Sequence, residues 1–260
     1  MWEEALKLEL EIFIIGEIKE IKNMHKPKLV FLTGAGISAE SGVKTFRDHN
    51  GLWEDHDVME VASIEGWRKD RETVLRFYNQ RRRQLDEVEP NLAHRLIAEL
   101  EEKYEVTIVT QNVDDLHERG GSSKIIHLHG ELKKMCSSNN KELTLPYDKN
   151  IEIGDKHPDG SQLRPYIVWF GENVPLLDSA ISVVRKADIL VVVGTSLQVY
   201  PAAGLARYAP ANCDLYYIDP NPADDPMMTY FTVIPKKATE GMPELIQLLN
   251  QKNDQIQSAQ

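Results

Sequence analysis

The sequence is poor in cysteine, which limits the ways in which its fold can be held together. Only Cys136 and Cys213 occur among the 260 residues, and two cysteines cannot form a disulfide framework. As an isolated pair they also cannot supply the four ligands of a structural zinc site. This low cysteine usage indicates a reducing compartment, and we expect the protein in the cytoplasm.

Basic residues are scarce relative to acidic ones. The chain has 30 lysines and arginines against 41 aspartates and glutamates, which gives a net charge of −11. This charge repels phosphate backbones, so it argues against nucleic acid as the main partner and favours a basic peptide. No run approaches the roughly 20 apolar residues that span a bilayer, and we therefore expect a soluble protein without a membrane segment.

Residues 1–23 have an unusual pattern and are treated as an N-terminal extension. Apolar residues alternate with polar ones from Leu6 to Ile14. Glu3 and Glu4 stand where a signal peptide would carry basic residues, so the segment is not interpreted as a targeting sequence. Two interpretations stay open: an added edge strand, or an upstream extension of a chain that starts at Met24.

Five short apolar runs, each ending in small or polar residues, indicate a buried parallel sheet. These runs are residues 29–32, 106–109, 125–128, 189–193 and 215–218. Helical stretches fit between them, for instance at residues 91–103 and 177–186. The predicted fold is therefore α/β, with a Rossmann-like, doubly wound parallel sheet.

The predicted main domain covers residues 24–250 and contains two insertions. Residues 48–85 are charged and predicted to be helical, whereas residues 135–164 are polar and rich in turn formers. We expect the insertions to form a smaller module, and we expect the polar tail at residues 251–260 to be frayed. Ligands of doubly wound sheets bind beyond the carboxyl ends of the strands, which is where the site is expected.

The segment Gly34-Ala35-Gly36-Ile37-Ser38-Ala39 fits the glycine pattern of dinucleotide-binding loops. It follows a predicted strand and opens a predicted helix, the context in which glycines let the backbone approach a pyrophosphate. No lysine followed by serine or threonine closes the loop, so a P-loop nucleotidase is not indicated. The next residues, 41–48, also depart from the pattern of a hydride-transferring dehydrogenase.

Further motifs follow in a fixed order along the chain. They are residues 34–53, 110–117 (TQNVDDLH), 127–130 (HLHG), 168–172 (VWFGE), 194–196 (GTS) and 199–203 (VYPAA). Together they resemble the sirtuin family of NAD-dependent protein lysine deacylases, over roughly residues 28–249. Within that family the sequence is most similar to bacterial deacylases that resemble the mitochondrial desuccinylase class, because residues 77–83 (FYNQRRR) look like their acyl-pocket segment.

The resemblance implies a reaction between NAD and an acylated lysine. The acyl oxygen attacks the ribose carbon that bears nicotinamide, and the products are nicotinamide, free lysine and an O-acyl-ADP-ribose. By motif position His129 is the general base, a role that suits a neutral imidazole. Asn112 and Asp114 correspond to the nicotinamide side and complete the predicted catalytic set. His127 is expected to point away from His129 and to be structural.

The resemblance also assigns residues that bind the cofactor NAD. Phe46 and Arg47 match the flexible cofactor loop, where the ring would shield the reacting sugar and the guanidinium would meet phosphate. The full predicted set is Gly34, Ala35, Gly36, Ala39, Phe46, Arg47, Trp53, Gln111, Asn112, Val113, Asp114, Gly194, Thr195, Ser196, Asp219, Pro220, Asn221 and Ala238.

A second set of residues is expected to bind the acylated lysine and its peptide. Tyr78 and Arg81 would share a helix face, where phenol and guanidinium could hold the distal carboxylate of succinyl- or malonyl-lysine. The alternative is that the arginines at 81–83 form an exposed basic face. Residues 168–172 are expected to pair with the peptide as an added strand. The contacting residues there are Val168, Phe170 and Gly171.

The small module departs from the family pattern. Sirtuins usually carry four cysteines there, whereas Cys136 stands alone between His129 and Arg164. We therefore expect a zinc-ribbon-like but metal-depleted module that is held by packing. The predicted function is NAD-dependent deacylation of acylated proteins. Two alternatives stay open, an NAD-dependent protein ADP-ribosyltransferase and a non-catalytic NAD-sensing module, and the sequence does not indicate an oligomeric state.

Overall fold

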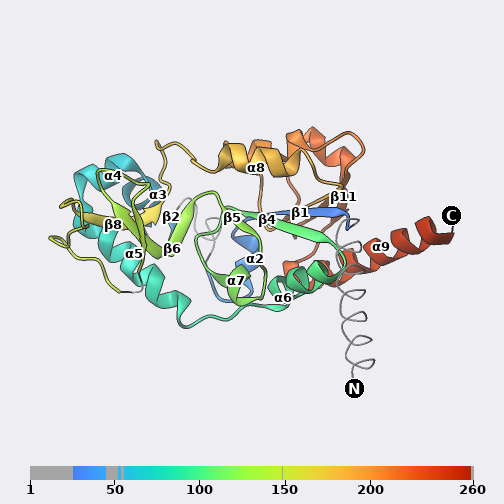
Figure 1. Ribbon diagram of the computed structural model, residues 1–260, viewed down its shortest axis with the longest axis horizontal. Helices are drawn as coiled ribbons and strands as arrows, with labels where there is room; N and C mark the ends of the chain where they lie inside the picture. The colour runs from blue at the N-terminus through green and yellow to red at the C-terminus, as the bar shows by residue number, and fades with distance from the viewer. Residues whose placement is uncertain (1–25, 45–51, 54–55, 148, 259–260) are drawn as a thin grey trace, which may run out of the picture.

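The computed structural model describes residues 26–44, 52–53, 56–147 and 149–258, and Figure 1 shows their arrangement. The extension at residues 1–23 and the predicted cofactor residues Phe46 and Arg47 lie outside the described residues. A parallel sheet with helices on both faces forms the larger part, and a smaller module lies at one end of it. Within this described part, no helix has the length and apolar character needed to cross a membrane.

The main sheet has six strands in the described chain, all parallel, in the order β11-β10-β9-β1-β4-β5. The strands are β1 (Lys28–Thr33), β4 (Glu105–Thr110), β5 (Ile125–His127), β9 (Ile189–Val193), β10 (Asp214–Ile218) and β11 (Thr232–Ile234). This is the strand order of a doubly wound nucleotide-binding sheet, and the winding direction reverses between β1 and β9. The predicted fold is confirmed, with β11 as a strand that the sequence did not indicate.

Helices lie between these strands, and a longer one, α9, follows the last strand. They are α2 (Gly36–Ala39), α6 (Leu92–Glu99), η1 (Leu100–Glu102), α7 (Leu116–Arg119), α8 (Leu177–Val184), η2 (Ala202–Tyr208), η3 (Pro226–Tyr230) and α9 (Ala238–Ser258). The predicted helix at 91–103 is confirmed as α6 with η1, and that at 177–186 as α8. The helix predicted after the glycine loop is present but has only four residues.

Strand β1 shows why its sequence is apolar throughout. Leu29 and Phe31 face the layer that contains α6 and α9, whereas Val30 and Leu32 face the layer that contains α8. Successive side chains of a strand point to opposite faces, so a strand that is covered on both sides is apolar at every position. Figure 1 shows α8 on one side of the sheet and α6 and α9 on the other.

The C-terminal helix corrects the expectation of a frayed tail. Helix α9 continues to Ser258, because its last turns are tied to the main domain. Lys252 forms an ion pair with Asp214, and the Asn253 amide donates a hydrogen bond to the Tyr104 hydroxyl over 2.8 Å. A polar composition is therefore compatible with an ordered helix when individual polar groups find partners on the sheet domain.

The two insertions meet in one small module (Figure 1). The first contributes β2 (Leu52–Trp53), β3 (His56–Asp57), α3 (Val58–Val61), α4 (Ile64–Lys69) and α5 (Arg71–Leu85); the second contributes β6 (Gly130–Ser137), β7 (Thr144–Pro146) and β8 (Leu163–Ile167). Strands β7, β6 and β8 form an antiparallel sheet in that order. The sheet begins at Gly130, earlier than the predicted boundary at residue 135.

An aromatic core joins the two insertions. The ring centroids of Trp67 and Trp169 lie 5.3 Å apart, and those of Tyr78 and Trp169 lie 6.1 Å apart. The Arg164 guanidinium lies 3.5 Å from the centroid of the Trp169 ring, a distance typical of a cation–π contact. The module thus has an apolar core of its own, separate from the two layers of the main sheet.

Candidate active site

The predicted site residues follow the ends of neighbouring parallel strands. Gly34 follows β1, Gln111 follows β4, Gly194 follows β9 and Asp219 follows β10. Because the strands are parallel, their carboxyl ends lie along one edge of the sheet, on either side of the point where the winding reverses. The structure therefore brings four separate sequence motifs to the same edge.

The glycine loop packs directly against the loop after β9. The Gly36 amide donates a hydrogen bond to the Gly194 carbonyl over 2.8 Å, and a Cβ on Gly36 would lie 2.6 Å from the Gly194 Cα. Gly194 adopts a φ of +63°, and a Cβ there would lie 2.3 Å from the Ile37 amide nitrogen. No side chain fits between the two loops, so glycine is required at both positions.

Ser38 of α2 links the two residues predicted for the nicotinamide side. The Asn112 side-chain amide donates to Ser38 Oγ over 3.1 Å, and Ser38 Oγ donates to Asp114 Oδ2 over 3.0 Å. All three residues are buried, and burial raises the pKa of Asp114. Ser38 was not among the site residues predicted from the sequence. The available signal was a hydroxyl residue inside the glycine motif, where its side chain can face the next strand end.

His129 lies between β5 and β6, where the main sheet meets the small module. Its Nδ1 lies 3.1 Å from the Gln111 carbonyl oxygen, which can only accept, so Nδ1 carries the hydrogen. The lone pair of the neutral ring is then on Nε2. Burial lowers the pKa of His129 below its ordinary value of 6.5, and the Lys141 charge acts in the same direction. The ring therefore has the protonation state of a general base at neutral pH.

His127 contacts the carbonyl of Asn112, the residue after Gln111 in the turn that follows β4. Its Nδ1 lies 3.3 Å from the Asn112 carbonyl oxygen, and its Nε2 lies 2.7 Å from Glu118 Oε1. The ring is buried. Both histidines therefore reach the turn after β4. The expectation of opposite orientations is wrong, because residues two apart along an extended strand face the same side. Glu118 carries no sequence signal that singles it out from the other glutamates.

The loops after β4 and β9 are joined through Gln111 and Thr195. The Gln111 side-chain amide donates a hydrogen bond to Thr195 Oγ1 over 3.2 Å. Thr195 is buried, and its carbonyl accepts a hydrogen bond from the Tyr217 hydroxyl over 2.6 Å. These bonds fix the spacing between two predicted cofactor segments.

The predicted adenosine end is built from β10 and α9. Asp219 is buried, and its carboxylate accepts a hydrogen bond from the Asn221 amide over 2.9 Å. Ala238 is buried at the start of α9. Glu40 follows the glycine loop and accepts hydrogen bonds from the amide and hydroxyl of Thr239, so it ties α9 to that loop.

The remaining predicted cofactor positions differ in exposure. Ala39, Pro220 and Asn221 are exposed, whereas Ala35, Val113 and Ser196 are half-buried. Trp53 lies in strand β2 of the small module. The structure thus places the described positions on the glycine loop, on the strand ends and on the first insertion.

Tyr78 and Arg81 both lie on α5, inside the small module. Their exposed fractions are 1% and 5%, so neither belongs to an exposed basic face. Burial raises the pKa of the Tyr78 phenol, and the Arg81 charge partly opposes this effect. Arg81 Nη1 donates to Gln84 Oε1 over 3.0 Å. The structure therefore brings the predicted acyl-pocket residues together in a buried setting.

The three consecutive arginines have different environments. The buried Arg82 donates hydrogen bonds to the backbone carbonyl oxygens of Leu132 and Lys149, over 2.8 Å and 3.0 Å. Arg83 is exposed and donates to Asn150 Oδ1. The alternative of a continuous exposed basic face is therefore wrong, since Arg82 fastens α5 to the second insertion.

Residues 168–172 connect β8 to the helical part of the module. The Val168 amide donates to the His129 carbonyl over 2.8 Å. The Phe170 amide donates to the Ala62 carbonyl, and the Phe170 carbonyl accepts from the Ile64 amide. Much of this backbone is thus already paired. Among the residues that the structure describes, the Gly171 amide and the Val168 carbonyl have no such partner.

A hydrogen-bond network centred on Ser137 holds the turns of the second insertion. Ser137 Oγ donates to Asp159 Oδ2 over 2.5 Å and accepts from the amides of Asn139 and Asn140, both over 3.0 Å. The Ser161 hydroxyl and amide donate to Asp159 Oδ1 over 2.7 Å and 2.9 Å. The hydrogen bonds from Ser137 and Ser161 hold the pKa of Asp159 well below its ordinary value.

The chemistry of this region does not fit a zinc site. Cys136 is buried, and burial raises the pKa of its thiol to about 11. Deprotonating this thiol is therefore costly, and the small module has no second cysteine beside it, whereas structural zinc sites use several thiolates or imidazoles. The neighbouring hydroxyl and carboxylate groups are already hydrogen-bonded to one another.

One group of potential ligands elsewhere in the described chain is explained without a metal ion. Ligand atoms of Glu118, His127 and Glu131 lie within 4.8 Å of one another. Both ring nitrogens of His127 face acceptor oxygens, and Lys134 forms an ion pair with Glu131 over 2.7 Å. These contacts account for the grouping.

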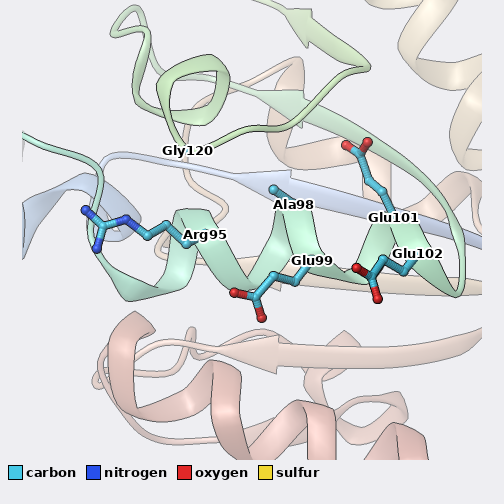
Figure 2. Close-up of a pocket in the computed structure, with 6 residues that line it drawn as sticks. All are labelled: Arg95, Ala98, Glu99, Glu101, Glu102 and Gly120. Atoms are coloured by element: carbon cyan, nitrogen blue, oxygen red, sulfur yellow. The ribbon is translucent and has the colours of Figure 1, made fainter.

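A surface pocket lies on α6 and η1 (Figure 2), and none of its lining residues is a predicted site residue. Its lining residues are Arg95, Ala98, Glu99, Glu101, Glu102 and Gly120. Three of them are glutamates, whose negative charge disfavours a pyrophosphate. This pocket is therefore not a candidate site for a dinucleotide.

Comparison with known proteins identifies the family. Residues 34–201 match the model of the Sir2 family. The chain is 55% identical to an NAD-dependent protein deacylase of Bacteroides thetaiotaomicron, over 85% of this chain and 97% of the relative. It is 56% identical to an NAD-dependent protein deacylase of Helicobacter pylori, over 84% of this chain and 95% of the relative. The chain belongs to the Sir2 family.

Solved structures of Sir2 proteins share this architecture. A Sir2 homologue in complex with ADP-ribose is 37% identical, with a TM-score of 0.79 over 88% of this chain and 94% of the other. A Sir2 protein with a deacetylated p53 peptide and 3′-O-acetyl ADP-ribose is 31% identical, with a TM-score of 0.73 over 88% and 97%. These likenesses confirm the sirtuin resemblance and the Rossmann-like fold.

Proposed function

We propose that the protein removes acetyl, succinyl and malonyl groups from lysine side chains in an NAD-dependent reaction. The observation that carries this proposal is the arrangement of three groups at one sheet edge: the glycine loop, the buried Ser38–Asn112–Asp114 network, and His129 with its lone pair on Nε2. As a Sir2 family member that is 55% identical to an NAD-dependent protein deacylase, the chain is an NAD-dependent protein deacylase. The acyl range and the residue roles are our inference.

The donor groups at the sheet edge fit NAD. When bound, NAD supplies a ribose carbon that loses nicotinamide. Ala35 would offer its backbone amide to the pyrophosphate. The Gly34 and Gly36 amides are bonded to the carbonyls of Val193 and Gly194, so these two glycines would instead keep the loop free of side chains and in place against Gly194. Thr195, Ser196, Asp219, Asn221 and Ala238 would line the adenosine end, and Phe46 and Arg47 are proposed to cover the reacting sugar.

Asn112 and Asp114 would orient the nicotinamide end. The amide of Asn112 and the carboxylate of Asp114 are held by the same buried hydroxyl, Ser38. Fixed polar groups of this kind can hold a carboxamide and a ribose in the reacting orientation without reorganising during the reaction. His129 would then accept a proton from a ribose hydroxyl at Nε2, because Nδ1 is committed to the Gln111 carbonyl.

Tyr78 and Arg81 support the acidic part of the acyl range. Both side chains are buried on the same helix, α5, and a guanidinium beside a phenol can bind the distal carboxylate of a succinyl or malonyl group. A phenol hydrogen bond and a guanidinium ion pair would together distinguish these chains from acetyl-lysine, which has no distal carboxylate.

The peptide is proposed to pair with residues 168–172. The Gly171 amide and the Val168 carbonyl are the backbone groups that remain for an added strand, since the Phe170 amide and carbonyl are used within the module. Recognition through the backbone depends little on the side chains of the bound peptide. The net charge of −11 supports basic acylated proteins as substrates and disfavours nucleic acid.

We also infer that the small module works without zinc and that the protein acts in the cytoplasm. The Ser137 network and the raised pKa of Cys136 support the first inference. Two free cysteines, Cys136 and Cys213, suit a reducing compartment.

Mass spectrometry of one lysine peptide, in acetylated and succinylated forms, tests the proposal. Wild type, His129→Ala and Arg81→Ala would be compared with and without NAD. NAD-dependent removal of both groups, abolished by His129→Ala, is the expected result, with a selective loss of desuccinylation in Arg81→Ala. Intact peptides with wild type would contradict the proposal; ADP-ribosylated protein would then favour a transferase, and NAD binding alone would favour a sensor.

A further inference from the structure

His127 is placed differently from an ordinary buried histidine, because both of its ring nitrogens face oxygen acceptors. Nδ1 lies 3.3 Å from the Asn112 carbonyl oxygen, and Nε2 lies 2.7 Å from Glu118 Oε1. A carbonyl accepts hydrogen bonds and a carboxylate accepts them, so each nitrogen must donate. The neutral ring has one N–H group and can satisfy one of these acceptors. The geometry is therefore that of an imidazolium.

This imidazolium closes a ring of contacts around the nicotinamide-side residues. The Asn112 side chain is bonded to Ser38, which is bonded to Asp114. Asp114 Oδ1 in turn accepts from the amide of Leu116, the first residue of α7. Glu118 lies on the same helix and reaches back to His127.

The backbone of Asn112 is thus held on both sides. Its amide donates to Thr110 Oγ1 over 3.0 Å, and its carbonyl faces His127. We propose that Glu118 and His127 are positioning residues, which hold Asn112 and Asp114 in the arrangement that binds the nicotinamide end, with His127 acting as a cation. This inference rests on the proposed roles of Asn112 and Asp114.

The charges around His127 support the cationic form. Burial by itself would lower the pKa of His127, but the hydrogen bond and charge of Glu118, together with the charge of Glu131 on β6, raise it above 6.5. Asp114 also faces the ring electrostatically. His117 of α7 also interacts with the ring; burial lowers its own pKa, so it stays neutral.

A loss of function at high pH follows from this arrangement. When pH rises through the pKa of His127, one of its two hydrogen bonds is lost and Asn112 is no longer held on both sides. The general base His129 has its pKa below 6.5, so its deprotonation governs the acid side of the pH profile. The two histidines would therefore set opposite limbs of one profile.

The test measures exchange of labelled nicotinamide into NAD and deacetylation of an acetyl-lysine peptide, as functions of pH. The variants are Glu118→Gln and His127→Gln, with Glu105→Gln as the matched control because Glu105 pairs with Lys124 on the surface. In Glu118→Gln we expect the alkaline limb at least about one pH unit lower than in wild type. Both test variants should lose about tenfold in exchange and in kcat/KM for NAD, with the KM for peptide unchanged.

Three outcomes separate this inference from the proposed function. An alkaline limb that is the same in wild type and Glu118→Gln overturns the positioning role, as does wild-type exchange in His127→Gln. If His127→Gln does not fold, as judged by its thermal unfolding, the exposed Glu118 decides the question. A wild-type protein without NAD-dependent deacetylation would overturn the proposed function itself, and the positioning role with it.

Discussion

Trp169 donates a hydrogen bond from its indole nitrogen to the Tyr78 hydroxyl over 3.0 Å. Trp169 belongs to the segment that is expected to pair with the peptide, and Tyr78 to the segment that is expected to select the acyl group. Both side chains are buried. The segment proposed to bind the peptide and the helix proposed to select the acyl group therefore share one contact in the core of the small module.

Removing the Tyr78 hydroxyl should change acyl selectivity. In Tyr78→Phe the ring still packs against Trp169, but the polar group proposed for the acyl carboxylate is gone. We expect kcat/KM for succinyl-lysine to fall about tenfold, as for the loss of a hydrogen bond to a charged group, with acetyl-lysine changed less. Arg83→Met is the matched control from the exposed part of α5. Equal losses for both acyl groups would contradict the assignment.

Adding a methyl group to Gly36 should separate the two loops at the sheet edge. The new Cβ would lie 2.6 Å from the Gly194 Cα, so the backbone must shift. We expect Gly36→Ala to lower the free energy of unfolding by about 2 kcal/mol or more and to raise the KM for NAD, measured by urea unfolding and steady-state kinetics. Gly204→Ala, where the nearest atom is a Tyr200 ring carbon at 3.8 Å, should have little effect on either quantity.

Asp159→Asn should loosen the second insertion. The carboxylate accepts hydrogen bonds from Ser137 and Ser161, and its pKa is lowered in the folded state. Its stabilising effect is therefore complete above the ordinary pKa of 3.8 and is lost as pH falls through the lowered value. We expect a melting temperature a few degrees lower at pH 7, with the difference from wild type shrinking in acid.

Melting temperatures of the wild-type protein also test the inference of a zinc-free module. EDTA should leave the melting temperature of the untagged wild-type protein unchanged, because no thiolate set is present to bind the metal. Stoichiometric zinc by elemental analysis would contradict this inference. For the Asp159→Asn variant, Glu142→Gln is the control, because it removes a negative charge at an exposed position of the same insertion.

The buried pair of His94 and His117 should make the fold sensitive to acid. Their rings lie 4.9 Å apart, and burial lowers the pKa of His94 to about 4, with Arg95 acting in the same direction. Below pH 6.5 His94 binds a proton in the unfolded chain but stays neutral in the folded protein. The free energy of unfolding therefore falls between pH 6.5 and 4, by about 3 kcal/mol for this residue.

His94→Gln removes one of these titrating groups, so the free energy of unfolding of the variant should depend less on pH. Urea unfolding of wild type and variant at pH 7 and pH 5 measures it. A wild-type stability that is equal at both pH values would contradict the assignment of a neutral buried histidine.

The parallel sheet was predictable because its strands are covered on both faces. Leu29 to Leu32 leave no position polar, and such a run has few other interpretations. Strand β11 was not predictable, since its three residues, Thr232 to Ile234, are too few to show a period. The continuation of helix α9 beyond Asn250 was also not predictable, because its partners, Asp214 and Tyr104, lie far away in the sequence.

The candidate site was predictable where backbone geometry demands a particular residue type. Gly36 and Gly194 are glycines because their loops touch. Positions of this kind form motifs that can be recognised in the sequence alone. Ser38 and Glu118 act through side-chain contacts to residues that are distant in sequence or on another element. The place of Ser38 inside the glycine motif was a weak signal, and no local pattern distinguishes Glu118 from other glutamates, so the partners of both residues emerged from the structure.

The hydrogen bond between the Val168 amide and the His129 carbonyl has a mechanical consequence. Gly130 and Ile167 continue this contact as a strand pair, so the proposed general base His129 and the proposed peptide-binding segment belong to one ladder. A tilt of the small module against the main sheet would move the backbone of His129 together with a paired peptide, and it would strain the contact between His129 Nδ1 and the Gln111 carbonyl. Such motion would change how the lysine meets the dinucleotide, while the alignment between the peptide and the backbone of His129 would be preserved.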